Sequence, residues 1–164
     1  MKGRLIPDAK TIGFNNNNNF HKLNEIGLNK AYYNNNKIHV EGNTLYVAGT
    51  SNLKDIFDDL TKIPFYGNLK DSTRYNQAKT ALDANPNITN LVGHSLGGSV
   101  ALQFQKDNKK IETITYGAPV FQIGAKLGTR FRFPFDPVSY LDNGAITMDR
   151  FSINPHSYSN YELN

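Results

Sequence analysis

The sequence predicts an α/β fold with a mainly parallel sheet and helices on both of its faces. Short strand-like runs alternate along the chain with runs that carry apolar residues at helical spacing. One glycine-rich turn, at residues 93–98, joins a strand-like run directly to a helical run. This alternation is typical of parallel sheets whose strands are connected by helices. We expect the 164 residues to form one domain of this kind.

The N-terminal third differs in composition from the rest of the chain. Residues 15–19 and 34–36 are runs of asparagine, a polar low-complexity pattern without the apolar side chains that a core needs. We therefore expect residues 1–37 to be an irregular segment, with loops around a small element near residues 21–30.

The elements after this segment follow from turn signals and from hydrophobic periodicity. A hairpin is expected over residues 38–49, because Gly42 and Asn43 form a turn signal between two strand-like runs. The later elements are expected in the order helix 53–62, helix 72–84, strand 88–92, helix 96–106, strand 111–116 and strand 130–135.

The composition excludes several kinds of site. The chain has no cysteine, which rules out disulfide bonds, thiolate zinc sites and a cysteine nucleophile. No run approaches the ~20 apolar residues of a membrane-spanning helix, and residues 1–10 lack the apolar core of a secretory signal. The net charge of +4 and the pI of about 9.2 predict a mildly basic surface, without a nucleic-acid motif. We expect a soluble protein with no nucleic-acid partner, and a secreted or virion-associated location would suit such a chain.

The turn at residues 93–98, Gly-His-Ser-Leu-Gly-Gly, has the pattern of a nucleophile elbow. In an elbow the serine adopts strained backbone that lifts its hydroxyl out of the sheet, and side chains at Gly93 and Gly97 would collide there. The helix that begins at the serine adds N–H groups and a positive dipole end, which favour an oxyanion. Ser95 is therefore the candidate nucleophile for acyl transfer. The alternative is a glycine-rich turn with an incidental serine.

A serine nucleophile needs a histidine base, which follows the serine in the chain order associated with this motif. His156 is the one histidine of four that lies after Ser95. His94 lies inside the turn and is expected to pack, while His21 and His39 lie too early in the chain. His156 is therefore the candidate base, and the alternative is a surface histidine in a polar loop.

The base in turn needs a carboxylate that fixes its tautomer. Asp136 follows the alternating run 130–135 and is expected at the carboxyl end of a strand, where active sites of open α/β sheets gather. Pro137 would hold it in an extended conformation. Asp142 precedes an Asn-Gly pair and is expected in a turn, and Asp149 is expected to be a solvated charge. Asp136 is therefore the candidate acid.

An oxyanion hole needs two donors beside the nucleophile. The N–H of Leu96, directly after Ser95, is the first candidate. The strand and turn at residues 45–51 supply the second, because Thr50 can offer both its N–H and its hydroxyl. Alternatively, Thr50 or Ser51 caps the helix expected next, and both roles are compatible.

Four blocks of the chain resemble, in order, the class 3 lipase family of α/β-hydrolases. They are residues 47–60, 91–98, 114–120 and 136–138, and the resemblance covers about residues 44–160. An arginine commonly precedes the Gly-Thr pair of the first block in this family, and this chain has Ala48 there. The resemblance implies a trimmed α/β-hydrolase fold and hydrolysis of carboxylic esters without a metal or an organic cofactor. It assigns the triad and the oxyanion hole to Ser95, Asp136 and His156, and to Thr50 and Leu96.

The resemblance favours a lipase or phospholipase that acts on lipid esters, and small soluble esters are a further substrate class. The basic charge adds an expected weak attraction to anionic membrane surfaces. Residues 63–66 and 121–123 are expected to line an acyl groove or to belong to the core. An acyltransferase or a serine peptidase would use the same three residues. The alternative from another class is a catalytically inactive hydrolase fold that serves as a binding or structural module.

Overall fold

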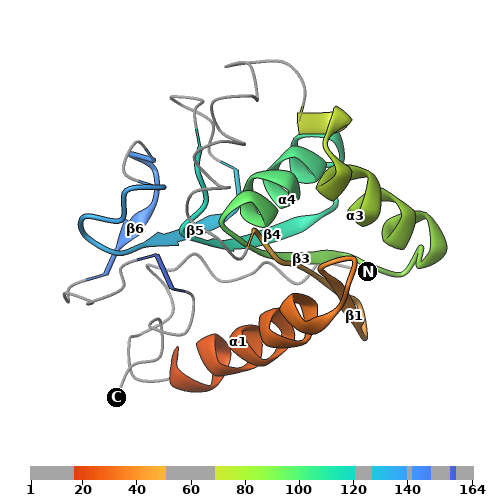
Figure 1. Cartoon of the computed structure of the whole chain (residues 1–164), viewed down its shortest axis with the longest axis horizontal. Coiled ribbons are helices and arrows are strands. Elements are labelled where there is room, and N and C mark those ends of the chain that lie inside the picture. The colour runs from red at the N-terminus through yellow and green to blue at the C-terminus, as the bar shows by residue number, and fades with distance from the viewer. Residues whose placement is uncertain (1–16, 51–68, 121–126, 140–141, 149–155, 158–164) are drawn as a thin grey trace.

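The centre of the molecule is a sheet whose strands lie in chain order (Figure 1). The computed structural model describes residues 17–50, 69–120, 127–139, 142–148 and 156–157. Within them the sheet has six strands: β1 (Ile38–Glu41), β2 (Thr44–Val47), β3 (Asn90–His94), β4 (Glu112–Tyr116), β5 (Thr129–Arg132) and β6 (Ile146–Thr147).

The strand directions confirm the mainly parallel sheet. β1 and β2 form an antiparallel hairpin, and every later neighbour pair from β2–β3 to β5–β6 is parallel. The helix α1 (Asn17–Tyr33) covers one face, and α3 (Thr73–Ala84) and α4 (Leu96–Asp107) cover the other, as Figure 1 shows. A short 3-10 helix, η2 (Leu69–Asp71), precedes α3. The expected helices on both faces are therefore present.

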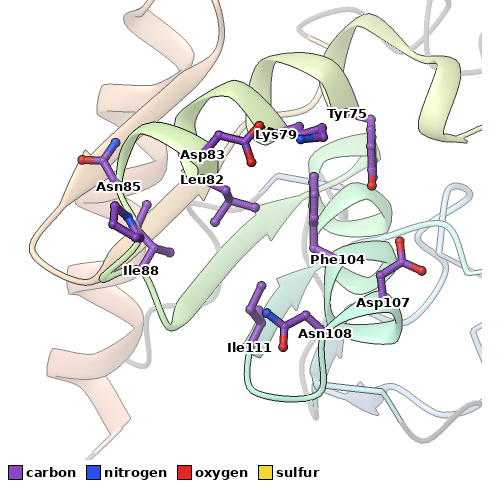
Figure 2. Close-up of a pocket in the computed structure, with 11 residues that line it drawn as sticks. Tyr75, Lys79, Leu82, Asp83, Asn85, Ile88, Phe104, Asp107, Asn108 and Ile111 are labelled. Carbon is purple, nitrogen blue, oxygen red and sulfur yellow. Dashed lines mark hydrogen bonds and ion pairs between the residues drawn. The ribbon is translucent and has the colours of Figure 1, made fainter.

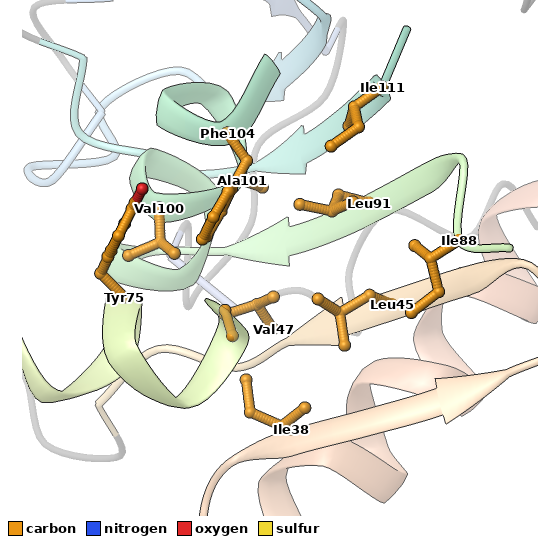
Figure 3. Close-up of a cluster of buried hydrophobic side chains, with 11 residues drawn as sticks. Ile38, Leu45, Val47, Tyr75, Ile88, Leu91, Val100, Ala101, Phe104 and Ile111 are labelled. Carbon is orange, nitrogen blue, oxygen red and sulfur yellow. The ribbon is translucent and has the colours of Figure 1, made fainter. Parts of the chain in front are cut away.

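The two faces of the sheet separate because successive strand residues point to opposite sides. On β3, Leu91 packs toward α3 and α4, whereas Val92 packs toward α1. The cluster on the α3 and α4 face is drawn in Figure 3. It includes a parallel stack of the Tyr75 and Phe104 rings, with centroids 4.3 Å apart. This stack joins α3 to α4 above the sheet.

The irregular segment expected over residues 1–37 is wrong for residues 17–33. The small element expected near residues 21–30 is present but longer, since residues 17–33 form the 17-residue helix α1. Asparagine has a modest helix propensity, so local sequence does not favour this helix. Packing does, because Leu28 and Ala31 are fully buried against the sheet and tertiary contacts supply most of the stability of helices in proteins.

Most of the other expected elements agree with the structure to within about two residues, but β6 was not expected and β5 is shorter than expected. The strand was expected to continue to Phe135 but ends at Arg132. Pro134 has no N–H for a strand ladder, and Phe135 has a positive φ of 63° that leaves the extended region. Asp136 therefore follows a turn rather than the strand itself. The helix expected at residues 53–62 lies outside the described residues.

Candidate active site

Ser95 lies alone between a strand and a helix. β3 ends at His94 and α4 begins at Leu96, and Ser95 has φ 53° and ψ −130°. A positive φ is strained for a residue with a side chain, and such strain concentrates at functional sites. The serine N–H donates to the Tyr116 carbonyl at 3.0 Å, and its own carbonyl accepts from Gly98 N–H at 2.8 Å. The strained serine that the sequence predicts is present and is held from both sides.

Three glycines make room for this turn. A Cβ at Gly93 would lie 2.5 Å from the carbonyl oxygen of Gly97, and a Cβ at Gly97 would overlap the carbonyl of Val47 on β2. A Cβ at Gly49 would lie 2.7 Å from that of Ser95. The first two follow from the sequence motif. The third shows that the loop after β2 lies directly against the serine.

Asp136 and His156 form a buried pair. His156 Nδ1 lies 3.0 Å from Asp136 Oδ1, and the two residues are 6% and 1% exposed. The carboxylate also accepts from Val138 N–H at 2.9 Å and from Ser139 Oγ at 2.5 Å. Burial by itself would raise the pKa of Asp136, but the hydrogen bonds from His156, Ser139 and Val138 outweigh it and lower that pKa. Because an ionised carboxylate only accepts, His156 carries its proton on Nδ1.

Among the described residues, Ser95 Oγ and His156 Nε2 are both buried without a hydrogen-bond partner. These two atoms are therefore not hydrogen bonded to each other. A buried polar group without a partner costs free energy, and a catalytic role is one reason for retaining it. Gly117 connects the two positions. Gly117 directly follows Tyr116, whose carbonyl accepts the hydrogen bond from Ser95 N–H. A Cβ at Gly117 would lie 3.2 Å from His156 Nδ1.

The two candidate oxyanion donors flank the serine. Leu96 is the first residue of α4, and the first N–H groups of a helix have no acceptor within it. Thr50 follows β2, next to the glycine that lies against Ser95, and its Oγ1 is a further buried atom without a described partner. Ser51, and the helix that Thr50 or Ser51 was expected to cap, lie outside the described residues.

His94 does more than the packing that was expected of it. Its ring is buried, with Nε2 2.7 Å from the carbonyl oxygen of His156 and Nδ1 2.6 Å from the hydroxyl of Tyr32. Desolvation and the neighbouring His156 lower the pKa of His94 to about 3, so the ring is neutral. The hydroxyl of Tyr32 also accepts from Gly49 N–H at 3.1 Å. Sequence reasoning missed Tyr32, because nothing in the pattern of a distant helix indicates a contact with the turn.

The other two histidines have polar partners of their own. His21 is buried on α1, with Nδ1 2.9 Å from the hydroxyl of Tyr116. His39 lies on the edge strand β1 beside Glu41, at 3.3 Å. Each has a structural environment of its own and neither contacts Asp136 through a described hydrogen bond.

Asp142 occupies the turn that was expected for it, and it is also buried. Its Oδ1 accepts from Gly144 N–H at 3.0 Å, and its Oδ2 forms an ion pair with Arg130 at 2.9 Å. Its carboxylate is therefore committed to the turn and to β5. Asp149 lies outside the described residues, as do the possible groove residues 63–66 and 121–123.

A cavity of about 390 Å³ lies between α3 and α4 (Figure 2). Ile88 and Ile111, which lie just before β3 and β4, line its inner end, and the stacked Tyr75 and Phe104 line it too. Ser95 follows the opposite end of β3. This cavity is therefore separate from the candidate active site.

Comparisons with protein-family models, with curated proteins and with solved structures found no significant match to this chain. Among the described residues, no three His, Cys, Asp or Glu side chains are grouped so that they could hold a metal ion. In that same part of the chain, no helix is both long and apolar enough to cross a membrane.

Proposed function

We propose that the chain is a serine ester hydrolase with a trimmed α/β-hydrolase fold. The observation that carries the proposal is the strained Ser95 between β3 and α4, at the same end of the sheet as a buried Asp136–His156 pair. The carboxyl ends of parallel strands are where α/β enzymes bind their ligands. A serine, a histidine and a carboxylate in this order are the groups that acyl transfer requires.

In the proposed reaction, Ser95 Oγ attacks the carbonyl carbon of an ester while His156 Nε2 takes the hydroxyl proton. Asp136 keeps the proton of His156 on Nδ1 and stabilises the imidazolium that forms. The tetrahedral intermediate collapses as the imidazolium protonates the leaving alcohol, which leaves an acyl group on Ser95. Water then attacks this acyl group with His156 again as base, and a carboxylic acid and the original serine are released.

The negative oxygen of the intermediate would be stabilised by the N–H of Leu96 and by Thr50. The Leu96 N–H belongs to the positive end of the α4 dipole. The Thr50 hydroxyl is buried, and a donor that is already desolvated is worth more than one in water. The reaction as proposed uses these donors and the three side chains, without a cofactor.

Lipid esters are the proposed substrates, and the support for them is the resemblance of four sequence blocks to class 3 lipases. The structure adds one apolar group beside the site, since Phe135 precedes Asp136 and is 72% exposed. The net charge of +4 would favour approach to an anionic lipid surface. These observations favour a lipase or phospholipase over an esterase for small soluble substrates.

The proposal is tested with p-nitrophenyl esters of short to long acyl chains and with phosphatidylcholine and anionic phospholipid vesicles. A fluorophosphonate probe, which loses fluoride to a reactive serine, gives a second readout by intact-protein mass. Hydrolysis and a single phosphonyl adduct, both absent in Ser95→Ala, are the expected result. A folded wild-type protein that neither turns over any ester nor takes up the probe would overturn the proposal.

One observation favours a second candidate, a hydrolase-like fold that binds a partner without turnover. Ser95 Oγ and His156 Nε2 are not hydrogen bonded, and a reacting nucleophile and base need that contact. We prefer hydrolysis because catalytic hydrogen bonds often tighten only when substrate is bound. Acyl transfer to an added alcohol, or cleavage of a peptide anilide, would identify an acyltransferase or a peptidase that uses the same three residues.

A further inference from the structure

We propose that Tyr32 and His94 act as positioning residues that fix the base His156 and the loop of Thr50 relative to Ser95. The proposal rests on the hydrolase function proposed above. Its basis is a chain of hydrogen bonds that begins at Gly49 N–H, passes through the Tyr32 hydroxyl and the His94 ring, and ends at the carbonyl of His156.

The donor and acceptor properties of these groups allow only one direction of donation along the series of hydrogen bonds. The carbonyl oxygen of His156 can only accept, so His94 Nε2 must donate to it, at 2.7 Å. In a neutral ring the other nitrogen is then an acceptor, so the Tyr32 hydroxyl donates to His94 Nδ1 at 2.6 Å. The Tyr32 oxygen in turn accepts from Gly49 N–H at 3.1 Å. Every donor in the chain therefore has an acceptor.

The ring of His94 has to be neutral for this arrangement. Protonation would put an N–H on both nitrogens, and the Tyr32 hydroxyl would lose its acceptor. Burial and the adjacent His156 lower the pKa of His94 to about 3, with Asp136 acting in the opposite direction. The ring consequently stays in the form that the hydrogen bonds require across the neutral pH range.

These hydrogen bonds support His156, which itself lies in a turn. Residues 156–157 belong to no strand or helix, so the place of His156 depends on tertiary contacts. Its side chain is held by Asp136 and its backbone by His94. His94 directly precedes Ser95 in the sequence. The base His156 is therefore connected to the nucleophile Ser95 through a single hydrogen bond, the one to the ring of His94.

The same hydroxyl reaches the loop that carries an oxyanion donor. Gly49 precedes Thr50 and lies against Ser95, where a Cβ would come within 3.2 Å of Oγ. The Tyr32 hydroxyl binds the N–H of Gly49 and the ring of His94 at once. Without this hydroxyl, Gly49 N–H and His94 Nδ1 would both lose this hydrogen bond. The loop of Thr50 and the base His156 would then be less well fixed in position.

The test compares Tyr32→Phe with Tyr33→Phe, which removes the hydroxyl of the neighbouring tyrosine, a side chain that is 89% exposed. We expect Tyr32→Phe to lower kcat by about 10-fold to 100-fold, because small displacements of catalytic groups are costly. KM should change less than about twofold, since the proposed role of the hydroxyl is to hold Gly49 and His94 and not to bind substrate. The rate of fluorophosphonate labelling should fall by the same factor as kcat, and Tyr33→Phe should match wild type.

A second pair of variants separates positioning from general damage to the fold. His94→Phe removes both ring hydrogen bonds, whereas His94→Gln keeps an N–H donor near the place of Nε2. We expect His94→Gln to recover part of the activity that His94→Phe loses, with similar thermal unfolding temperatures. An unchanged kcat and labelling rate in Tyr32→Phe, or a loss that only follows the unfolding temperature, would overturn the positioning role.

An NMR measurement does not depend on turnover. Nitrogen-15 spectra of the wild-type histidines should show His94 as the neutral Nε2–H tautomer at neutral pH. The Nδ1–H tautomer or an imidazolium would overturn the proposed direction of the chain even in an active enzyme. An inactive, unlabelled wild type that shows the expected tautomer would instead contradict the hydrolase function while leaving the chain in place.

Discussion

Asp136 and His156 form their 3.0 Å hydrogen bond against the backbone of Gly117. A Cβ at Gly117 would lie 3.0 Å from Asp136 Oδ2 and 3.2 Å from His156 Nδ1, and its φ is +56°. The pair is therefore enclosed by main chain on one side, where no side chain can intervene. In such a site of low dielectric, a hydrogen bond to a carboxylate is strong and its geometry is fixed.

We predict that Asp136→Asn lowers kcat by about 10⁴-fold while the protein stays folded. The amide has nearly the same shape but no charge, so it neither fixes the Nδ1–H tautomer of His156 nor stabilises the imidazolium. Steady-state ester hydrolysis and circular dichroism measure the two effects. The control is Asp83→Asn, the same change at an exposed residue that pairs with Lys79. An Asp136→Asn protein with more than about a tenth of wild-type kcat contradicts the assigned role.

Ser139→Ala is predicted to raise the pKa of Asp136. The serine Oγ donates to Asp136 Oδ2 at 2.5 Å and is one of the groups that hold this pKa low against the effect of burial. Carbon-13 NMR titration of the carboxyl group should show the increase. Thr80→Ala, which removes a hydroxyl bond to a helix carbonyl on the surface of α3, should leave it unchanged. Equal pKa values of Asp136 in wild type and Ser139→Ala would argue against the hydrogen bond.

The free energy of unfolding should decrease as the pH is lowered, because of His94. Its pKa is about 3 in the folded protein and 6.5 in an ordinary environment, so between these values the unfolded chain binds a proton that the folded protein does not. The contribution of His94 to stability is therefore complete above pH ~6.5. It decreases by about 1.4 kcal/mol for each pH unit below that value. The pKa of Asp136 is lowered as well, so its contribution is lost only at more acid pH.

Urea unfolding of wild type and His94→Gln from neutral pH down to about pH 4 measures this contribution. The variant has no titrating group at position 94, so its stability should decline less steeply as the pH falls. In parallel, the His94 ring resonances of folded wild type should show no protonation down to about pH 4. Identical slopes, or a ring that titrates near pH 6, would contradict a buried neutral His94.

Local features of the fold could be predicted from the sequence because their causes are local. Gly42 adopts the positive φ of 60° that the hairpin turn requires, and a Cβ at Gly93 would collide with the carbonyl of nearby Gly97. Helix periodicity likewise identified α4, whose buried residues include Val100, Ala101 and Phe104. Each of these depends on residues a few positions apart.

The features that sequence reasoning missed depend on contacts between distant segments. Helix α1 forms from a sequence of low propensity because Leu28 and Ala31 pack under the sheet. Tyr32 meets His94 across 62 positions of the chain. No periodic pattern encodes contacts of these kinds. The early end of β5 is different, because it has a local cause: the turn at residues 134–135, where Phe135 has a φ of 63°, interrupts the alternating pattern.

Gly49→Ala should disable the site, and Gly42→Ala should not. At Gly49 a side chain is excluded by lack of space and not by the backbone conformation. A Cβ there would lie 2.7 Å from Ser95 Cβ and 2.9 Å from the His94 carbonyl oxygen. Neither atom can rotate away, so the serine or the loop of Thr50 must shift. Such a displacement should lower kcat by at least about 10-fold, and overpacking should cost about 1–3 kcal/mol of stability.

Gly42→Ala provides the matched comparison. A Cβ there meets nothing within 4 Å, but the φ of +60° makes any side chain costly, by about 1–2 kcal/mol. Both variants should therefore lose similar stability in urea unfolding, while kcat falls in Gly49→Ala alone. This separates the effect of stability from that of geometry, because the alanine at position 42 strains a hairpin that carries none of the proposed catalytic groups. Equal kcat values in the two variants would mean that the loop after β2 does not set the position of Ser95.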